Sequence, residues 1–172
     1  DHRAFSPSDV GPENILLNDA GVQFMDYEWG GFRDATLDIA YALVTMRAQL
    51  SMPNLVDRAD LEISMIDAWR SEVAGIWPAL RHDGELAHKL LSARLAWVWL
   101  STVWMLPDAE TSDPVPGSYA ANTHDWALHT NDPRVIVARW TDLASAAHRA
   151  GDTVMADFAT TVELALQRAW LS

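Results

Sequence analysis

Residues 6–40 read SPSDVGPENILLNDAGVQFMDYEWGGFRDATLDIA, and this stretch decides which fold we expect. Two short apolar runs, residues 14–17 and 22–25, flank residues 18–21, whose sequence Asn-Asp-Ala-Gly is typical of a turn. Two such runs around a turn predict a β-hairpin. The next residues, 26–33, include two adjacent glycines and are expected to form a loop.

The rest of the chain has the periodicity of helices. From residue 34 onward, apolar residues recur at every third or fourth position, as they do on the buried face of a helix. Residues 107–123 contain three prolines and are expected to form a loop. We expect about five helices: from Asp34 to before Pro53, from Asp57 or Asp60 to before Pro78, from about Gly84 to Leu106, from Asp132-Pro133 to Gly151, and from Asp152 onward.

The composition is that of a folded protein with a large core. The chain has 172 residues, of which 49% are hydrophobic, and it contains nine tryptophans. This length suits a single domain. We therefore expect one mainly α-helical domain over residues 1–172. In it, residues 1–33 form a short β-hairpin with the catalytic and metal-binding loops, and residues 34–172 form a helical bundle.

Charge and residue types exclude several classes of function. Aspartate and glutamate number 24 against 12 lysines and arginines, so a nucleic acid is not an expected partner of this acidic chain. Without cysteine, the chain forms neither disulfides nor thiolate metal sites. The longest apolar stretch, about residues 95–106, is shorter than the roughly 20 residues that cross a bilayer, so no membrane is expected either. No signal peptide is visible, and these features are those of a cytoplasmic protein.

Carboxylates and one amide gather at both ends of the predicted hairpin. Asp9 and Asn14 precede the first strand, and Asp26 and Glu28 follow the second. Because a hairpin brings its ends together, we expect Asp9, Asn14 and Asp26 to converge. Phosphoryl transfer needs such a set: a carboxylate that accepts the proton of the attacking hydroxyl group, here Asp9, and oxygen ligands for Mg²⁺, here Asn14 and Asp26. Glu28 is a candidate for a further metal or substrate contact.

In order and spacing, residues 6–41 resemble the C-terminal lobe of the aminoglycoside phosphotransferase and choline kinase-like family, which has a protein-kinase-like fold. The family's catalytic loop reads His-Gly-Asp-x-x-x-x-Asn. An apolar strand, an Ile-Asp-x-Glu/Asp segment and a Gly-x-x-x-x-Asp-Leu-Ala helix start follow it. The corresponding residues here are Ser6-Pro-Ser-Asp-Val-Gly-Pro-Glu-Asn14, Val22-Gln-Phe-Met-Asp-Tyr-Glu28 and Asp34-Ala-Thr-Leu-Asp-Ile-Ala40.

The resemblance implies an ATP-dependent kinase that acts on a hydroxyl group of a small molecule. It implies that Asp9 is the catalytic base, and that Asn14 and Asp26 bind Mg²⁺ and the phosphates of ATP. Asp38 is expected to brace the catalytic loop from its helix. An acidic site suits a cationic substrate such as an amino sugar or an amino alcohol, with contacts from the helical part and from residues 107–123.

The chain departs from the family pattern at two points. Pro7 replaces the histidine that supports the catalytic loop. The family's N-terminal lobe, which covers ATP and supplies a lysine, would precede residue 1, whereas Lys89, the only lysine, lies in a predicted helix far downstream. We expect that lobe upstream and expect this chain to be inactive without it. Two alternatives stay open: a non-catalytic helical module that binds a small molecule or a protein, and a purely structural helical domain.

Aromatic and histidine residues elsewhere offer further candidates. Trp97, Trp99 and Trp104 would suit a cation pocket, because tryptophan is the best cation–π partner, but their helical spacing favours the core. His124 and His129 lack the spacing of a zinc site.

Overall fold

The computed structural model describes residues 2–49, 55–106, 128 and 130–172. The chain forms two compact units, Asp1–Arg94 and Leu95–Ser172. The described part is mainly helical and has two small antiparallel sheets, both in the first unit, so the expected fold class is confirmed at this level. Within these ranges, no helix combines the length and the apolar character needed to cross a membrane.

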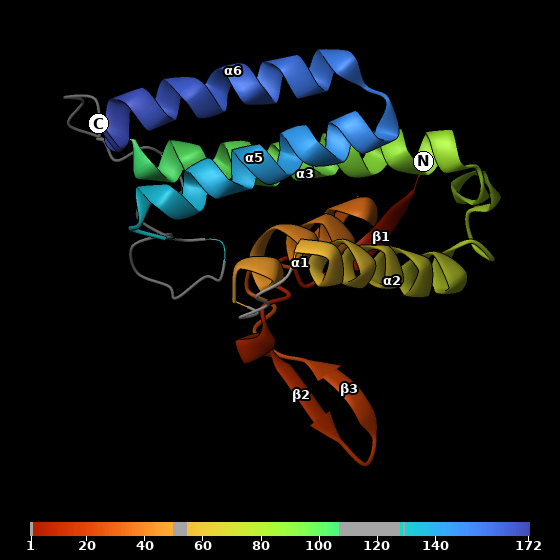
Figure 1. The fold of residues 1–172 in the computed structure, drawn as a ribbon. Helices are drawn as coiled ribbons and strands as arrows, with labels where there is room; N and C mark the ends of the chain where they lie inside the picture. The colour runs from red at the N-terminus through yellow and green to blue at the C-terminus, as the bar shows by residue number, and fades with distance from the viewer. Residues whose placement is uncertain (1, 50–54, 107–127, 129) are drawn as a thin grey trace. The chain divides into compact units, whose positions relative to one another are not determined.

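The predicted hairpin is present in the first unit. Strand β2 (Ile15–Asn18) pairs antiparallel with β3 (Gly21–Phe24), with Asn18 opposite Gly21 at the turn (Figure 1). The side chain of Asn18 accepts a hydrogen bond from the N–H of Ala20 at 2.8 Å, as turn asparagines do. Gly21 has a φ of 102°, which is a backbone conformation that glycine adopts without strain.

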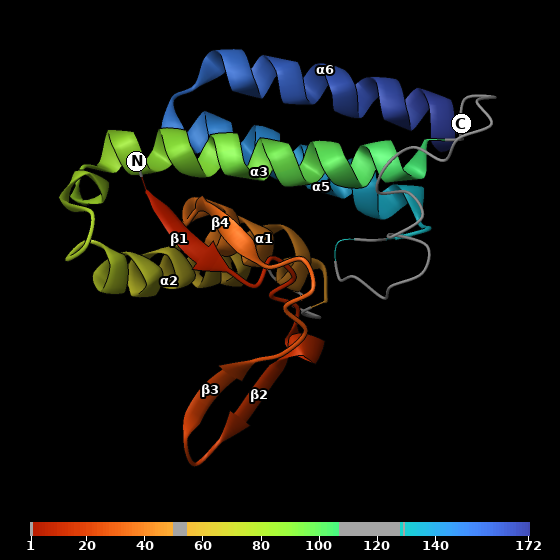
Figure 2. The same cartoon turned by 180° about the vertical axis from the view of Figure 1, so that it is seen from behind.

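A second sheet is not predicted by the local sequence. Strand β1 (Arg3–Ser6) pairs antiparallel with β4 (Gly31–Asp34), so the prediction of a loop over residues 26–33 is wrong for its last residues (Figure 2). Of the two adjacent glycines, Gly30 lies in a turn, where its N–H donates to the carbonyl group of Tyr27 at 2.8 Å. Gly31 is the first residue of β4. A four-residue strand whose partner lies far away in the chain leaves little local pattern.

Helices complete the first unit. They are α1 (Thr36–Gln49), α2 (Leu55–Val73) and the first part of α3 (Asp83–Met105). The start of α1 agrees with the prediction: the carboxylate of Asp34 accepts hydrogen bonds from the backbone N–H and the hydroxyl group of Thr36, at 3.0 and 2.8 Å. The predicted stop at Pro53 lies outside the described residues.

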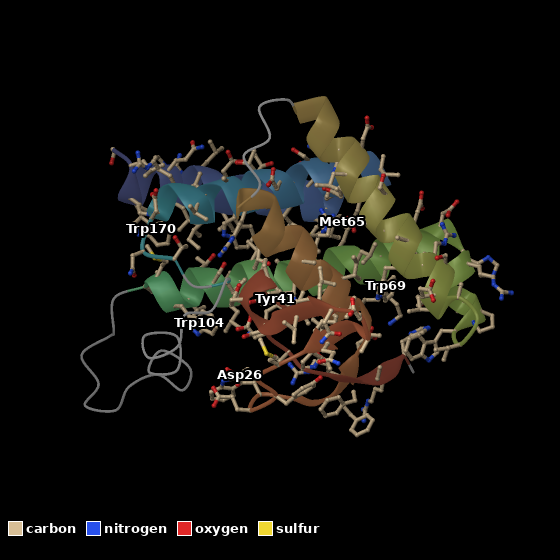
Figure 3. The ribbon with its side chains drawn as sticks, turned by 90° about the horizontal axis from the view of Figure 1, so that it is seen from below. Asp26, Tyr41, Met65, Trp69, Trp104 and Trp170 are labelled. Atoms are coloured by element: carbon tan, nitrogen blue, oxygen red, sulfur yellow. The ribbon has the colours of Figure 1, made fainter. Side chains whose placement is uncertain are left out.

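An apolar cluster forms part of the core of the first unit. Residues of α2 and of the segment after it pack against buried side chains of α1, α3 and a short 3₁₀ turn at Pro78–Arg81; Met65 and Trp69 of α2 are labelled in Figure 3. The buried members are Ile39, Leu43, Leu80, Leu86 and Leu90, and the partly buried ones are Met65, Ile66, Trp69, Val73 and Trp77.

The second unit contains the rest of α3 together with α5 (Pro133–Ala150) and α6 (Thr153–Trp170). Helix α5 starts and stops at the predicted residues, and α6 starts where predicted. Asp132 and Asp152 accept hydrogen bonds from backbone N–H groups of the first turns, at 2.9 Å each, and Gly151 ends α5 with a φ of 75°.

Two of the described tryptophans, Trp97 and Trp140, are buried in the second unit. Trp140 is fully buried and donates a hydrogen bond to the hydroxyl group of Thr102 at 2.9 Å. Its ring packs edge-on against Trp99, with ring centroids 6.2 Å apart. Trp97 is also buried, which agrees with the core prediction, but Trp99 is 51% exposed, so the prediction is wrong for Trp99. The loop predicted at 107–123 and both His124 and His129 lie outside the described residues.

Candidate active site

Asp9 is the buried centre of the candidate site. It follows β1 and is only 7% exposed. The hydroxyl group of Tyr41 donates to Oδ1 of Asp9, and Nδ2 of Asn14 donates to Oδ2 at 3.0 Å and to the backbone carbonyl group at 3.2 Å. The structure thus brings Asp9 and Asn14 together. Each oxygen of the carboxylate accepts a hydrogen bond from a different residue.

The hairpin carries Asp26 back to the start of β2. The N–H of Met25 donates to the carbonyl group of Asn14 at 2.8 Å, which extends the pairing of β2 and β3 to the residue before Asp26. Asp26 itself is exposed, and it is labelled with Tyr41 in Figure 3. Glu28 is exposed as well, and its carboxylate accepts a hydrogen bond from the indole of Trp29 at 2.9 Å.

Two residues with positive φ lie in the segments around Asp9 and Asp26. Among the described residues, the non-glycine residues with positive φ are Ser8 (77°) and Asp26 (58°). Side chains with a Cβ atom are strained there, and such strain gathers at functional sites, where the surrounding structure holds it. One of these residues directly precedes the predicted base, and the other is a predicted metal ligand.

A network of polar side chains supports the loop that carries Asp9. The hydroxyl group of Ser6 donates to Asp38 of α1 at 2.5 Å and accepts from the N–H of Ser8 at 2.9 Å. Arg33 of β4 donates to the hydroxyl group of Ser8 at 2.6 Å. Asp38 therefore contacts the loop from α1, which is the position expected of a residue that braces it.

Burial makes Asp38 harder to ionise. It raises the pKa of this carboxyl group above its usual 3.8, although the hydrogen bond from Ser6 and the charge of Arg33 act in the opposite direction. The folded protein thus holds this proton more tightly than the unfolded chain, so the contribution of Asp38 to stability falls as pH rises above 3.8.

We expect this effect to appear as a pH-dependent difference between the wild type and Asp38→Asn, because asparagine does not titrate. The free energy of unfolding of the wild type, minus that of the variant, should decrease as pH rises from 3.8 to the raised pKa of Asp38. Urea denaturation at a series of pH values measures it. A difference that stays constant or increases with pH would contradict the raised pKa.

Sequence reasoning missed three residues that shape the site: Tyr41, Arg33 and Ser8. Tyr41 fits the apolar periodicity of the helix that follows Asp34, and that periodicity gives no reason to assign it to the site. A signal for it exists, because Tyr41 lies three positions after Asp38, and residues with this spacing share a helix face. No local signal could identify Arg33, which reaches Ser8 only because β4 pairs with β1.

The first unit also has an open cavity of 460 Å³ that includes none of the predicted site residues. Asp34, Glu85, His88 and Lys89 are among its lining residues. Lys89 forms an ion pair with Asp34 at 2.9 Å. Burial alone would raise the pKa of Asp34, but the hydrogen bonds from Lys89 and Thr36 outweigh it and lower that pKa.

The oxygens of Asn14 and Asp26 are of the type that Mg²⁺ prefers. The contacts of Asn14 to Asp9 use its amide nitrogen, so they do not consume the amide oxygen, which is the metal-ligating atom. Within the described ranges, no group of three or more His, Cys, Asp or Glu side chains forms a metal site. Mg²⁺ commonly takes only one or two protein ligands and completes its shell with water and phosphate oxygens.

Comparison with models of protein families and with curated proteins gives no match to this chain.

Proposed function

We propose that this chain carries the catalytic segment of an ATP-dependent phosphotransferase, which transfers the γ-phosphate to a hydroxyl group of a small molecule. The observation that carries the proposal is that Asp9 is a buried carboxylate which accepts hydrogen bonds from two side chains. The positive φ values of Ser8, next to the proposed base, and of Asp26, a proposed metal ligand, support it. The proposal includes membership of the aminoglycoside phosphotransferase and choline kinase-like family, action in the cytoplasm, and an upstream lobe that covers ATP.

Asp9 orients the attacking hydroxyl group and accepts its proton. The contacts from Tyr41 and Asn14 each use one of the two carboxylate oxygens. An ionised carboxylate has about four lone-pair positions, so both oxygens retain capacity to accept the substrate hydroxyl group.

Asn14 and Asp26 would hold Mg²⁺, since they offer an amide oxygen and a carboxylate. When bound, the ion neutralises charge on the phosphates of ATP. The hairpin supports this assignment, because the backbone hydrogen bond from Met25 to Asn14 pairs one proposed ligand with the residue directly before the other. Glu28 is exposed next to this segment and offers a carboxylate to an ammonium group. We therefore propose amino sugars or amino alcohols as acceptors.

The experiment is a phosphate-transfer assay on the protein made from its whole gene. ADP release and the mass of the product are followed with Mg-ATP and a panel of amino sugars and amino alcohols. The matched controls are neutral sugars of the same ring size, which test the role of the ammonium group. We expect a phosphorylated product that requires Mg²⁺. A folded protein that phosphorylates no member of the panel would refute the proposed substrate class, and failure to bind Mg-ATP would refute the reaction.

A non-catalytic binding module is the second candidate. The hairpin favours it, because Leu17 and Val22 are 74% and 59% exposed, and exposed apolar groups mark interaction surfaces. In this case the assay yields no product, while a cationic ligand or a protein partner still binds the folded chain.

A further inference from the structure

Arg33 of β4 lies between the two segments that carry the candidate site. Its Nη1 donates to the hydroxyl group of Ser8 at 2.6 Å, and its Nη2 donates to the carbonyl group of Trp29 at 2.7 Å. Ser8 directly precedes Asp9, and Trp29 directly follows Glu28. One guanidinium group therefore ties the loop of the candidate base to the segment of the candidate metal and substrate contacts.

The loop before Asp9 needs such support. Ser8 has a φ of 77°, which strains any residue with a Cβ atom. Ser8 is 3% exposed and takes part in two hydrogen bonds. Its N–H donates to the hydroxyl group of Ser6, and its own hydroxyl group accepts from Arg33. Pro7, the residue before it, has no N–H group and no polar side chain, so it cannot contribute a donor to the loop.

We propose that Arg33 is a positioning residue that keeps Ser8 in its left-handed conformation and so fixes the Asp9 carboxylate relative to the Asp26–Glu28 segment. The proposal rests on the proposed phosphotransferase function. Arginine suits the task because its planar guanidinium group presents separate N–H groups to two acceptors at once. Lysine would offer one point charge and could not hold both acceptors in the same geometry.

Amide hydrogen exchange measured by NMR tests the tether without any assay of activity. The amides of Ser8 and Gly30 are suitable probes, because each donates to an acceptor in one of the two tied segments, at 2.9 and 2.8 Å. In Arg33→Met, we expect both amides to exchange about ten times faster, the effect of losing hydrogen bonds to a charged group. Arg3→Met on the paired strand β1 is the matched control and should leave both rates unchanged.

Kinetics of the whole gene product then test positioning against a purely structural role. We expect Arg33→Met to lower kcat about tenfold or more with little change in KM for Mg-ATP, because a displaced Asp9 weakens the chemical step more than binding. Ser8→Gly removes the backbone strain, since glycine adopts this φ freely. Adding Arg33→Met to Ser8→Gly should therefore have a smaller effect than Arg33→Met alone.

The outcomes separate this proposal from the proposed function. Unchanged exchange at Ser8 and Gly30 in Arg33→Met overturns it, and so does an equal acceleration of all amides in helices α1 and α3. If Arg33→Met fails to fold, Ser8→Ala removes the acceptor alone, and an unchanged exchange rate at position 8 overturns the proposal. If the wild type transfers no phosphate, the proposed function fails, while the exchange rates still decide whether Arg33 ties the two segments.

Discussion

Replacing Asp9 with asparagine is expected to abolish phosphate transfer while the protein remains folded. A general base contributes about a hundred- to ten-thousand-fold to a rate, and asparagine cannot accept the proton. The fold should survive because the amide oxygen can still accept the bond from Tyr41, and Asn14 can still bond to the backbone carbonyl group of residue 9. We expect a loss of stability of about 1 kcal/mol, typical of one altered hydrogen bond.

Asp19→Asn is the matched control for this variant. Asp19 is an exposed carboxylate at the turn of the same hairpin, so the substitution changes the charge equally but leaves the site intact. Its kcat should equal that of the wild type. Turnover retained by Asp9→Asn would remove Asp9 from the role of base, and a loss of turnover in both variants would indicate a general effect of charge.

The second large effect is expected at a buried ion pair. Glu62 of α2 and Arg94 of α3 meet at 2.6 Å, and their side chains are 9% and 6% exposed. Replacing Glu62 with leucine leaves a buried guanidinium group without its carboxylate. Breaking a buried pair in this way costs about 3–5 kcal/mol, so we expect a decrease of this size in the free energy of unfolding. Urea denaturation followed by circular dichroism measures it.

A surface pair and a double variant provide the controls. Arg70 and Asp83 meet at 2.7 Å, but the side chain of Asp83 is 91% exposed, so Asp83→Asn should change stability by at most about 1 kcal/mol. The double variant with Glu62→Leu and Arg94→Met should recover much of the loss, since two apolar side chains leave no buried charge. A loss in Glu62→Leu no larger than in Asp83→Asn would show that burial does not set the strength of the Glu62–Arg94 pair.

Local signals were sufficient to predict both ends of α5, the start of α6 and the hairpin, whereas α2 starts at Leu55 and not at the predicted Asp57 or Asp60. Asp132, Asp152 and Gly151 act on backbone groups within a few residues of themselves, so their effect is visible in the sequence. The turn between β2 and β3 is equally local. The pairing of β1 with β4 has no such signal, because it joins segments on either side of the hairpin and needs the chain to be folded already.

The residues of the candidate site also differ in whether the local sequence could identify them. Asp9 and Asn14 could be paired from the sequence, because five positions and one short turn separate them. Tyr41, which donates to the same carboxylate, comes from α1 and was not identified. The positive φ of Ser8 was also invisible, because serine rarely adopts it without contacts from other parts of the structure.

The sequence by itself determined the mainly helical class, the hairpin, the ends of several helices and the choice of carboxylates to examine. Only the tertiary structure decided which groups hold Asp9, how β4 enters a sheet, and where the guanidinium group of Arg33 is placed. The physical reason is the range of the interactions. Caps and turns are satisfied within a few residues, whereas a buried carboxylate, a strained serine and an arginine with two acceptors are stabilised by groups that only folding brings near.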